Sequence, residues 1–229
     1  MATPIVESAL TKEFAAPATS HLVDYPATVN ADDLLLIIFA NDGTSAITDP
    51  SGYTALDTEA IAGAGQMGIY AKVAAGSEGD GIEDVVTATG EEACSQIYRI
   101  TNWGGTIATD IDIAAPVAET TTTPNPPSVT AGWGADTNLF IAIVGAANDD
   151  AIATSGPSSW TDLLTVRANA GINNSPSIHT ARLASSNATE DPGTFTLDES
   201  ETCESFTLVI KPAAAAGNTG IQLKQGLFV

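Results

Sequence analysis

Residues 40–56 and residues 147–163 are two versions of one segment. Both begin Ala-Asn-Asp, pass through a Pro-Ser turn, and end in an aromatic residue followed by Thr-x-Leu, so that Tyr53 matches Trp160. The two segments align without a gap. Self-similarity at a long spacing is the signature of a structural unit that is used more than once. The chain is therefore expected to fold as two related halves.

Further blocks match in the same order along the chain. They pair Leu34–Phe39 with Leu139–Val144, Ala71–Ala74 with Ala181–Ala184, and Glu92–Cys94 with Glu201–Cys203. Chance could produce one such block, but several in one order indicate duplication of a common strand pattern.

Each half has the rhythm of β-strands and turns. A continuous apolar run is followed by Asn-Asp and Pro-Ser turns, an aromatic-Thr-x-Leu strand, an alternating strand and a closing strand. No window combines a 3.6-residue apolar period with helix caps. Short strands at this spacing are typical of sandwiches and barrels. The sequence predicts an all-β fold, a jelly-roll-like β-sandwich built from two sequence-related repeats.

The boundaries follow from the same pattern. We expect an N-terminal arm and first strand in residues 1–28, a first repeat in 29–113, a Thr/Pro-rich connector in 114–128, a second repeat in 129–212, and an apolar tail in 213–229. The connector could separate two domains or cross between halves of one sandwich. One compact body is favoured, because an isolated half would expose strand edges and apolar faces.

The charge balance excludes several partners. The chain has 7 basic and 28 acidic residues and a formal net charge of −21. Phosphate binding needs clusters of Lys and Arg, so neither nucleic acid nor an anionic membrane is expected as a partner. No secretory signal is recognised. The 44 % hydrophobic content excludes disorder for most of the chain.

The C-terminal end differs from this acidic body. No Asp or Glu follows Glu204, and the last ten residues are largely apolar. Such an end is better placed against a partner than in water, although a frayed tail or a strand on its own domain is the alternative. The candidate partner-binding residues are Ile221, Leu223, Leu227, Phe228 and Val229.

Motifs of catalysis and cofactor binding are weak. Gly63–Gly68 matches G-x-G-x-x-G, but a dinucleotide site needs that motif between a strand and a helix, and no helix pattern follows. A hairpin loop is the preferred interpretation. His21 and His179 are the only histidines, and no nucleophile motif supports a triad. No cofactor, no metal and no catalytic residue is predicted.

Two further residue groups leave alternatives open. The acidic loops 78–84 and 148–150 offer oxygen ligands for Ca²⁺, but solvated surface loops are the default in so acidic a chain. Cys94 and Cys203 hold equivalent positions in the alignment, so they are either a disulfide or two buried thiols, and the thiols are favoured.

The large aromatic residues also allow two interpretations. They could stack on sugars or plug the ends of the core, and core packing is favoured for Tyr53, Trp103, Trp133 and Trp160.

The motifs of the strands resemble a recurrent type of bacteriophage virion protein. Asp33-Leu34-Leu35-Leu36, Pro50-Ser51-Gly52-Tyr53-Thr54, Tyr70-Ala71-Lys72-Val73-Ala74 and the closing Leu208 to Ala213 resemble its "GDLLL", "P-x-G-W-T", "Y-x-K-V-A" and "L-x-x-P-A" patterns over roughly residues 20–215. The chain departs from the type with Asp32 for Gly and Tyr53 for Trp. These motifs are structural, so they carry over no active residue.

The resemblance implies a non-enzymatic β-sandwich of the phage particle, such as a capsid decoration (cement) protein, a head fibre or a tail appendage. The expected function is that of a capsid decoration (cement) protein on the exterior of the virion, with the major capsid protein or other virion proteins as partners and with homo-oligomers in the particle. The alternative is a tail-fibre or appendage module that binds a host glycan or receptor. A glycan-degrading enzyme is a third alternative; it would need a carboxylate pair in a cleft, which sequence alone cannot show.

Overall fold

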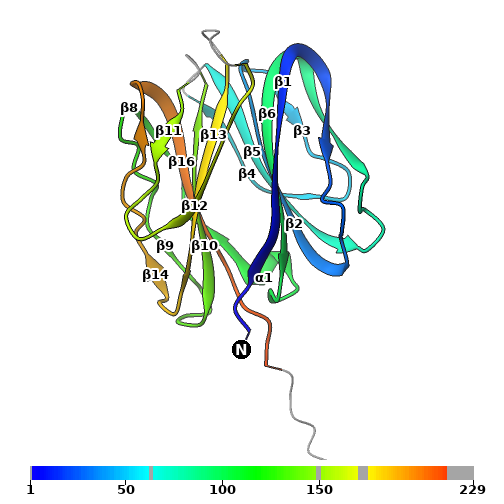
Figure 1. Ribbon diagram of the computed structural model, residues 1–229, viewed down its shortest axis with the longest axis vertical. Helices are drawn as coiled ribbons and strands as arrows, with labels where there is room; N and C mark the ends of the chain where they lie inside the picture. The colour runs from blue at the N-terminus through cyan, green and yellow to red at the C-terminus, as the bar shows by residue number, and fades with distance from the viewer. Residues whose placement is uncertain (1, 62–63, 148–150, 170–174, 216–229) are drawn as a thin grey trace, which may run out of the picture.

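The strands form two antiparallel sheets that face each other (Figure 1). The computed structural model describes residues 2–61, 64–147, 151–169 and 175–215. The first sheet has the order β1-β6-β2-β5-β4 and comes from the first half of the chain. Its strands are β1 (Ile5–Asp24), β6 (Ile82–Thr101), β2 (Ala31–Asn41), β5 (Gly65–Ala75) and β4 (Thr54–Ile61), and the short β3 (Ile47–Thr48) pairs with β6.

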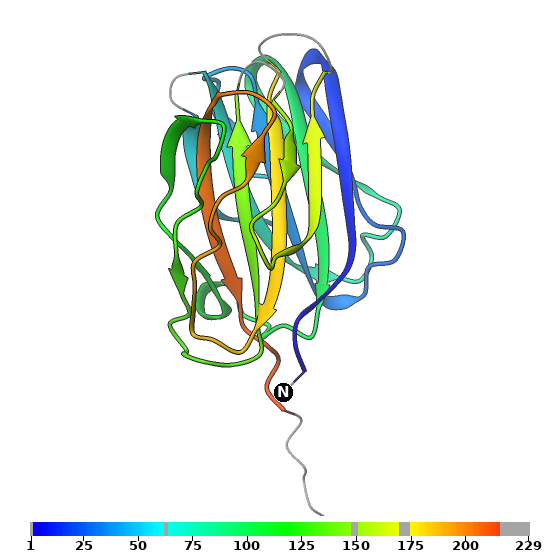
Figure 2. The same ribbon diagram turned by 60° about the vertical axis from the view of Figure 1, so that its left-hand side comes forward.

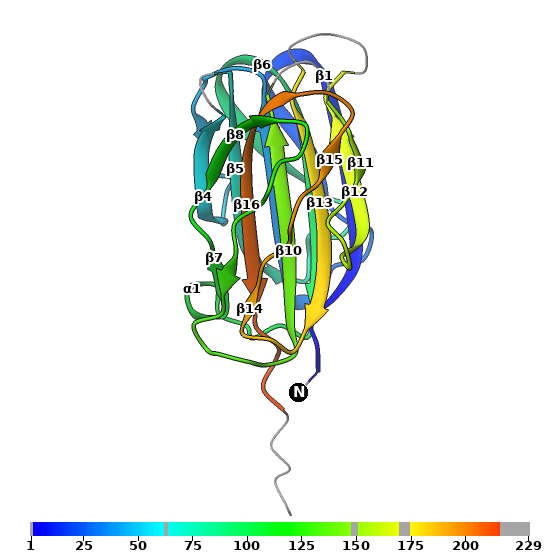
Figure 3. The ribbon, with the colours of Figure 1, turned by 90° about the vertical axis from the view of Figure 1, so that its left-hand side faces the viewer.

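The second sheet comes from residues 111–210 and has the order β12-β13-β10-β16-β7. Figure 3 shows β16, β10 and β13 side by side. The strands are β12 (Thr161–Arg167), β13 (Ser177–Ser185), β10 (Asn138–Ala146), β16 (Glu201–Ile210) and β7 (Ile111–Ile113), and β8 (Val117–Thr121) also pairs with β16. Two small ladders join β11 (Ala153–Ser155) to β15 (Thr196–Leu197) and β14 (Thr189–Glu190) to β9 (Val129–Thr130), and α1 (Ile107–Asp110) precedes β7.

One apolar core lies between the sheets and draws on both of them. It includes Leu34 and Ile100 from the first sheet and Leu139 and Ile210 from the second. Burial of this shared surface is the main source of the sandwich's stability. The all-β sandwich expected from the sequence is confirmed.

The outer face of each sheet is covered as well. Three apolar clusters fill these faces, one on the first sheet and two on the second. In β2, Leu34, Leu36 and Ile38 face the central core while Leu35 and Ile37 face outward, and all five are fully buried. A strand that is buried on both faces needs apolar residues at every position, which explains the continuous apolar runs of β2 and β10.

The two halves share one strand arrangement. β2 lies between β6 and β5, and β10 lies between β16 and β13 in the same way. Both Pro-Ser turns close with the same hydrogen bond, from Tyr53 N to Pro50 O and from Trp160 N to Pro157 O, each 3.1 Å. Gly52 and Ser159 occupy the same place in these turns with φ of 75° and 70°. Origin of the halves by duplication stays a prediction.

The pairing of the strands shows that two of the predicted matches between the halves are shifted by one residue, the one at Ala71–Ala74 and the one at Glu92–Cys94. Leu34 lies opposite Ile100 and Val73, and Leu139 lies opposite Ile210 and Ala184. Lys72 therefore corresponds to Leu183, and Cys94 corresponds to Glu204 rather than to Cys203. A shift of one residue moves a side chain to the other face of a sheet.

The two cysteines accordingly lie in different layers. Cys94 is in the core between the sheets, and Cys203 is in an outer cluster of the second sheet. Both are buried and free. The predicted equivalence of the two positions is wrong, and the favoured interpretation as separate buried thiols is confirmed.

A polar network crosses the core and ties the sheets together. The side-chain amide of Gln96 in β6 donates to the carbonyl oxygens of Leu164 and Ile178 in the second sheet, each at 3.1 Å. Thr180 Oγ1 donates to Gln96 Oε1 at 2.7 Å, and Tyr98 Oη donates to the same oxygen at 3.0 Å. Because these buried polar atoms are paired across the sheets, they fix how one sheet lies on the other.

The N-terminal segment and the connector are both part of the sheets. Residues 5–24 form β1, which pairs with β6 along most of its length and bends with it, with register shifts between Phe14 and Ser20. Lys12 Nζ and Asp24 Oδ2 lie 2.8 Å apart, so the two arms of the bent strand approach each other. Residues 117–121 of the connector form β8. Figure 2 shows β1 in blue along one margin of the molecule.

Candidate functional site

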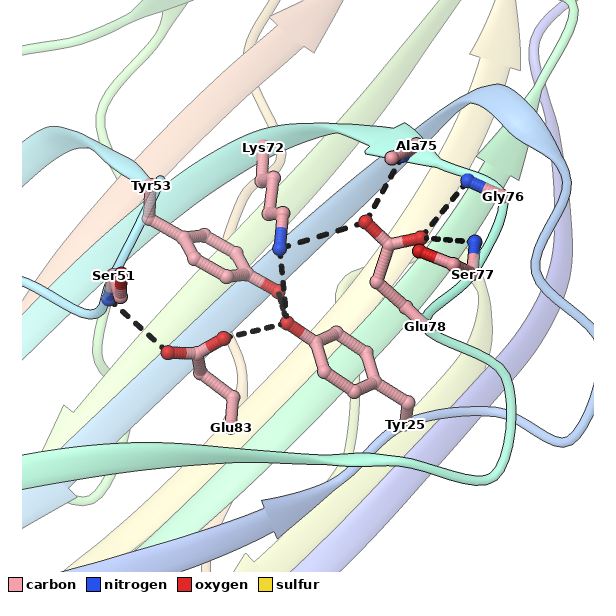
Figure 4. A network of polar contacts seen from close by, with 9 residues as sticks. All are labelled: Tyr25, Ser51, Tyr53, Lys72, Ala75, Gly76, Ser77, Glu78 and Glu83. Atoms are coloured by element: carbon pink, nitrogen blue, oxygen red, sulfur yellow. Dashed lines mark hydrogen bonds and ion pairs between the residues drawn. The ribbon is translucent and has the colours of Figure 1, made fainter.

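Five side chains on the outer face of the first sheet form a polar clasp (Figure 4). Tyr25 Oη donates to Glu83 Oε2 at 2.6 Å, Tyr53 Oη donates to Tyr25 Oη at 3.3 Å, and Lys72 Nζ lies 3.5 Å from Tyr25 Oη. The ammonium group also lies 5.7 Å and 5.5 Å from the ring centroids of Tyr25 and Tyr53. The fifth member, Glu78, lies 3.5 Å from Lys72 Nζ. The clasp joins three stretches of the chain, at Tyr25, at Tyr53 and at residues 72–83.

Backbone amides complete the clasp. Glu78 accepts hydrogen bonds from Ala75 N, Gly76 N and Ser77 N at 2.9–3.0 Å. Burial raises the pKa of the Glu78 carboxyl, but these amides and Lys72 outweigh burial and bring it below the usual value. Glu83 Oε1 accepts from Ser51 N at 3.1 Å.

The tyrosine hydroxyls of the clasp are fixed as hydrogen-bond donors. Burial raises the pKa of Tyr25 and of Tyr53 far above the ordinary value, and the bond to Glu83 raises that of Tyr25 further. Both tyrosines therefore stay protonated at neutral pH, and their hydroxyls donate to Glu83 and to Tyr25. The clasp therefore fastens loops to the sheet.

The predicted acidic loop 78–84 contributes to this clasp. Its Glu78 and Glu83 bind backbone amides and a tyrosine. Within the described parts of the chain, no group of three or more His, Cys, Asp or Glu side chains is placed to hold a metal ion. Residues 148–150, the other acidic loop, lie outside the described ranges.

Both histidines are buried in structural positions. His179 Nδ1 accepts from Ala153 N at 3.4 Å, and its Nε2 lies 3.1 Å from Ser177 Oγ. Burial lowers the pKa of His179 to about 4. His21 lies between the carbonyl oxygens of Val85 and Glu91, at 3.2 and 3.1 Å. Neither ring is exposed to solvent.

The glycine motif and the large aromatic residues, the other candidates from the sequence, belong to strands or pack in the apolar clusters. β4 and β5 form a hairpin in which Ile61 lies opposite Gly65, so Gly65–Gly68 are the start of β5, and Gly63 lies outside the described residues. Trp103 and Tyr53 are buried, whereas Trp133 and Trp160 pack half-buried against the outer clusters of the second sheet. The four do not form an exposed platform, in agreement with core packing. The predicted partner-binding residues 221–229 lie outside the described part of the chain.

Among the described residues, Glu204 and Asp42 have carboxyl groups with a raised pKa. Burial, and then the nearby carboxylates of Glu59 and Asp57, raises the pKa of Glu204 to about 7. Burial and Glu91 raise that of Asp42 to about 6. Carboxyl groups with a perturbed pKa accompany catalysis when they line a cleft. Neither residue lines the surface hollows along β1.

A surface groove runs along β1 where that strand faces β12 of the other sheet. It consists of three adjoining hollows of about 270, 290 and 380 Å³. Residues 3–12 line one side of it, and Leu163, Leu164 and Arg182 contribute to the other. We call this feature the β1 groove. Sequence reasoning missed it, because the groove depends on which edges of the two sheets lie together.

Exposed apolar side chains lie on the two strands that border the β1 groove. Among the described residues, exposed large apolar side chains include Ile5, Leu10 and Leu22 on β1 and Leu163 on β12. Ser8 Oγ and Ser95 Oγ, from residues that line the groove, are buried and lack a hydrogen-bond partner within the described structure. Described strands pair with β1 only along its β6 side. An apolar strand edge with unsatisfied polar groups is a surface suited to a second polypeptide.

No described helix is long and apolar enough to span a bilayer. Comparisons of the chain with protein-family models, with curated proteins and with solved structures found no match.

Proposed function

We propose that the chain is a non-enzymatic structural protein of a bacteriophage particle, a capsid decoration protein that binds the exterior of the head. The observation that carries an assembly role is the surface along the β1 groove, where exposed apolar side chains lie beside a strand edge that has no described partner. The phage setting comes from the resemblance of the strand motifs to virion proteins. The partners are the major capsid protein or other virion proteins, together with further copies of the chain.

The positions of the ionisable groups support a binding role over catalysis. His21, His179 and both cysteines are buried, and the carboxylates of the clasp are bound to amides and tyrosine. Asp162, in the β1 groove, pairs with Arg182 at 2.9 Å, which lowers the pKa of its carboxyl. A glycosidase needs one carboxyl that is kept protonated near its partner in the cleft, and Asp162 is the opposite case.

The net charge of −21 fits a molecule displayed in many copies. A strongly acidic surface repels nucleic acid and neighbouring solvent-facing surfaces, and it keeps the protein soluble at high local concentration. Weak binding of each copy is multiplied when many copies bind one particle.

Cryo-electron microscopy of purified particles with quantitative gel analysis tests the proposal. Hundreds of copies that follow the capsid symmetry are the expected result. In parallel, binding to empty capsids is measured for the wild type, for Leu10→Glu in the β1 groove, and for Val73→Glu on β5, since both side chains are 38 % exposed. We expect Leu10→Glu to weaken capsid binding and Val73→Glu to leave it unchanged. A handful of copies at the tail, or none in the particle, would overturn the capsid assignment.

A tail-fibre module that binds a host glycan or receptor is the second candidate. It requires accessible aromatic rings, and Trp133 and Trp160 are the half-exposed ones among those considered. Glycan-array binding that is lost in Trp133→Ala would favour this candidate over decoration.

A further inference from the structure

We propose that the β1 groove binds residues 220–229 of a second copy of this chain as an added β-strand. This inference deepens the proposed function, on which it rests for its biological setting, by naming the partner. It is carried by the geometry of the groove and by the pattern of the C-terminal segment.

The groove offers what a strand needs along its whole length. The hollows are lined by every residue from Thr3 to Lys12, a stretch equal in number to residues 220–229. At about 3.3 Å per residue, the two stretches have the same extended length. β1 is the edge strand of its sheet, and an added strand pairs its N–H and C=O groups with such an edge.

The sequence of the segment has the alternation of a half-buried strand. Ile221, Leu223, Leu227 and Val229 share one parity, with Gln225 between them, while Gln222, Lys224 and the two glycines share the other, on which Phe228 is the one apolar side chain. A strand with this period presents one apolar face and one polar face. The apolar face would fill the three hollows, and the polar residues would face water.

Charge also favours this occupant. The segment contains Lys224 and no acidic residue. In the groove, Lys12 pairs with Asp24 and Arg182 pairs with Asp162, which leaves the exposed carboxylate of Glu7 as the remaining charge.

The direction of the chain indicates a second copy rather than the same one. Ala213 bridges Ala2 in an antiparallel sense, so at this point the C-terminal chain runs opposite to the start of β1. To enter its own groove the chain would have to reverse within a few residues, whereas the groove of a neighbour can be entered directly. Exchange of segments between copies gives a closed dimer, or an open array when the exchange is head to tail.

The test combines analytical ultracentrifugation with peptide binding. We expect the wild type to associate as its concentration rises, and the tail variant Leu223→Asp/Leu227→Asp to stay monomeric. A fluorescent peptide of residues 218–229 is then added to the full-length tail variant, whose own segment cannot compete. The peptide should bind this recipient. Adding Leu10→Glu to the recipient should weaken the affinity more than tenfold, and adding Val73→Glu should leave the affinity unchanged. Thermal melting confirms that each variant is folded.

Each outcome decides the proposal. The wild type could be monomeric at every concentration and fail to bind the peptide, while the tail variant binds it. That result would show that the segment occupies its own groove, and it would overturn the exchange. Equal peptide binding by the Leu10→Glu and Val73→Glu recipients would overturn the groove as the site. A tail variant that stays monomeric yet still binds capsids leaves decoration standing, whereas association in solution without capsid binding removes decoration alone.

Discussion

The outer faces of the two sheets solve the same packing problem with different chemistry. On the first sheet, loops are fastened by the polar clasp around Tyr53 and Lys72. On the second sheet, the corresponding positions hold Trp160 and Leu183, which belong to an apolar cluster with Phe140 and Val209. The same strand arrangement therefore accepts a polar or an apolar cover, provided that every buried polar group in a polar cover is paired, because a half-satisfied buried network is worse than an apolar one.

The largest expected effect comes from removing the aromatic residue of each Pro-Ser turn. Tyr53→Ala and Trp160→Ala should each lower the free energy of unfolding by about 3 kcal/mol, since each ring packs against the outer clusters of its sheet. Urea denaturation of both variants measures the loss. If one variant lost less than about 1 kcal/mol, the two turns would not be equivalent supports.

The clasp itself can be tested by removing single hydroxyl groups. Tyr25→Phe should cost about 2 kcal/mol, because Glu83 Oε2 loses its donor and is left partly buried. Tyr70→Phe is the matched control, since the Tyr70 hydroxyl is buried in the same cluster without a partner in the described structure. Equal losses in chemical denaturation of the two variants would contradict the role of the clasp.

One position in the shared strand arrangement holds Cys94 in the first half and Glu204 in the second. The folded-state pKa of Glu204 is raised to about 7, so the carboxyl is without penalty below its ordinary pKa of 4.5 and becomes destabilising as the pH rises toward 7 and above. Glu204→Gln should therefore raise the free energy of unfolding by about 2 kcal/mol at pH 8 and have no effect of that kind at pH 4.

Cys94→Ala serves as the control for this pH profile. Burial raises the pKa of the Cys94 thiol well above its usual value, so the thiol stays neutral across the same range. The change in stability from Cys94→Ala should be the same at pH 4 and pH 8. If the free energies of unfolding of Glu204→Gln and the wild type differed by the same amount at pH 4 and at pH 8, the raised pKa of Glu204 would be ruled out.

The smallest effect is expected at the positive-φ position of each turn. Ser159 adopts φ 70° at the place where the first half has Gly52 at φ 75°. Ser159→Gly should stabilise the fold by about 0.5 kcal/mol, and Gly52→Ala should destabilise it by about 1 kcal/mol. A Cβ on Gly52 would meet only Lys72 Cε at 3.8 Å, so backbone strain is the cause. Shifts of melting temperature in opposite directions are the expected measurement.

Sequence reasoning reached the sandwich but not the details that depend on register. The fully apolar runs of β2 and β10 predicted strands buried on both faces, and this was correct. Matching Cys94 with Cys203 failed because residue identity does not reveal which face of a sheet a residue occupies.

The clasp and the β1 groove could not be predicted either. Tyr25, Tyr53, Lys72, Glu78 and Glu83 belong to no common motif, and only the packing of loops on the first sheet brings them together. Loop 78–84 was considered as a cation site because carboxylates alone suggest one, whereas its actual partners are backbone amides that sequence patterns do not show.

The bonds of Gln96 across the core have a consequence for the order of events during folding. Each sheet is built from one half of the chain, so its ladders can form without the other half. The bonds from Gln96 to the carbonyls of Leu164 and Ile178 join residues 68 and 82 positions apart, and they can form only after both sheets exist. Docking of the sheets is therefore expected to be the late step, and replacement of Gln96 should speed unfolding more than it slows folding.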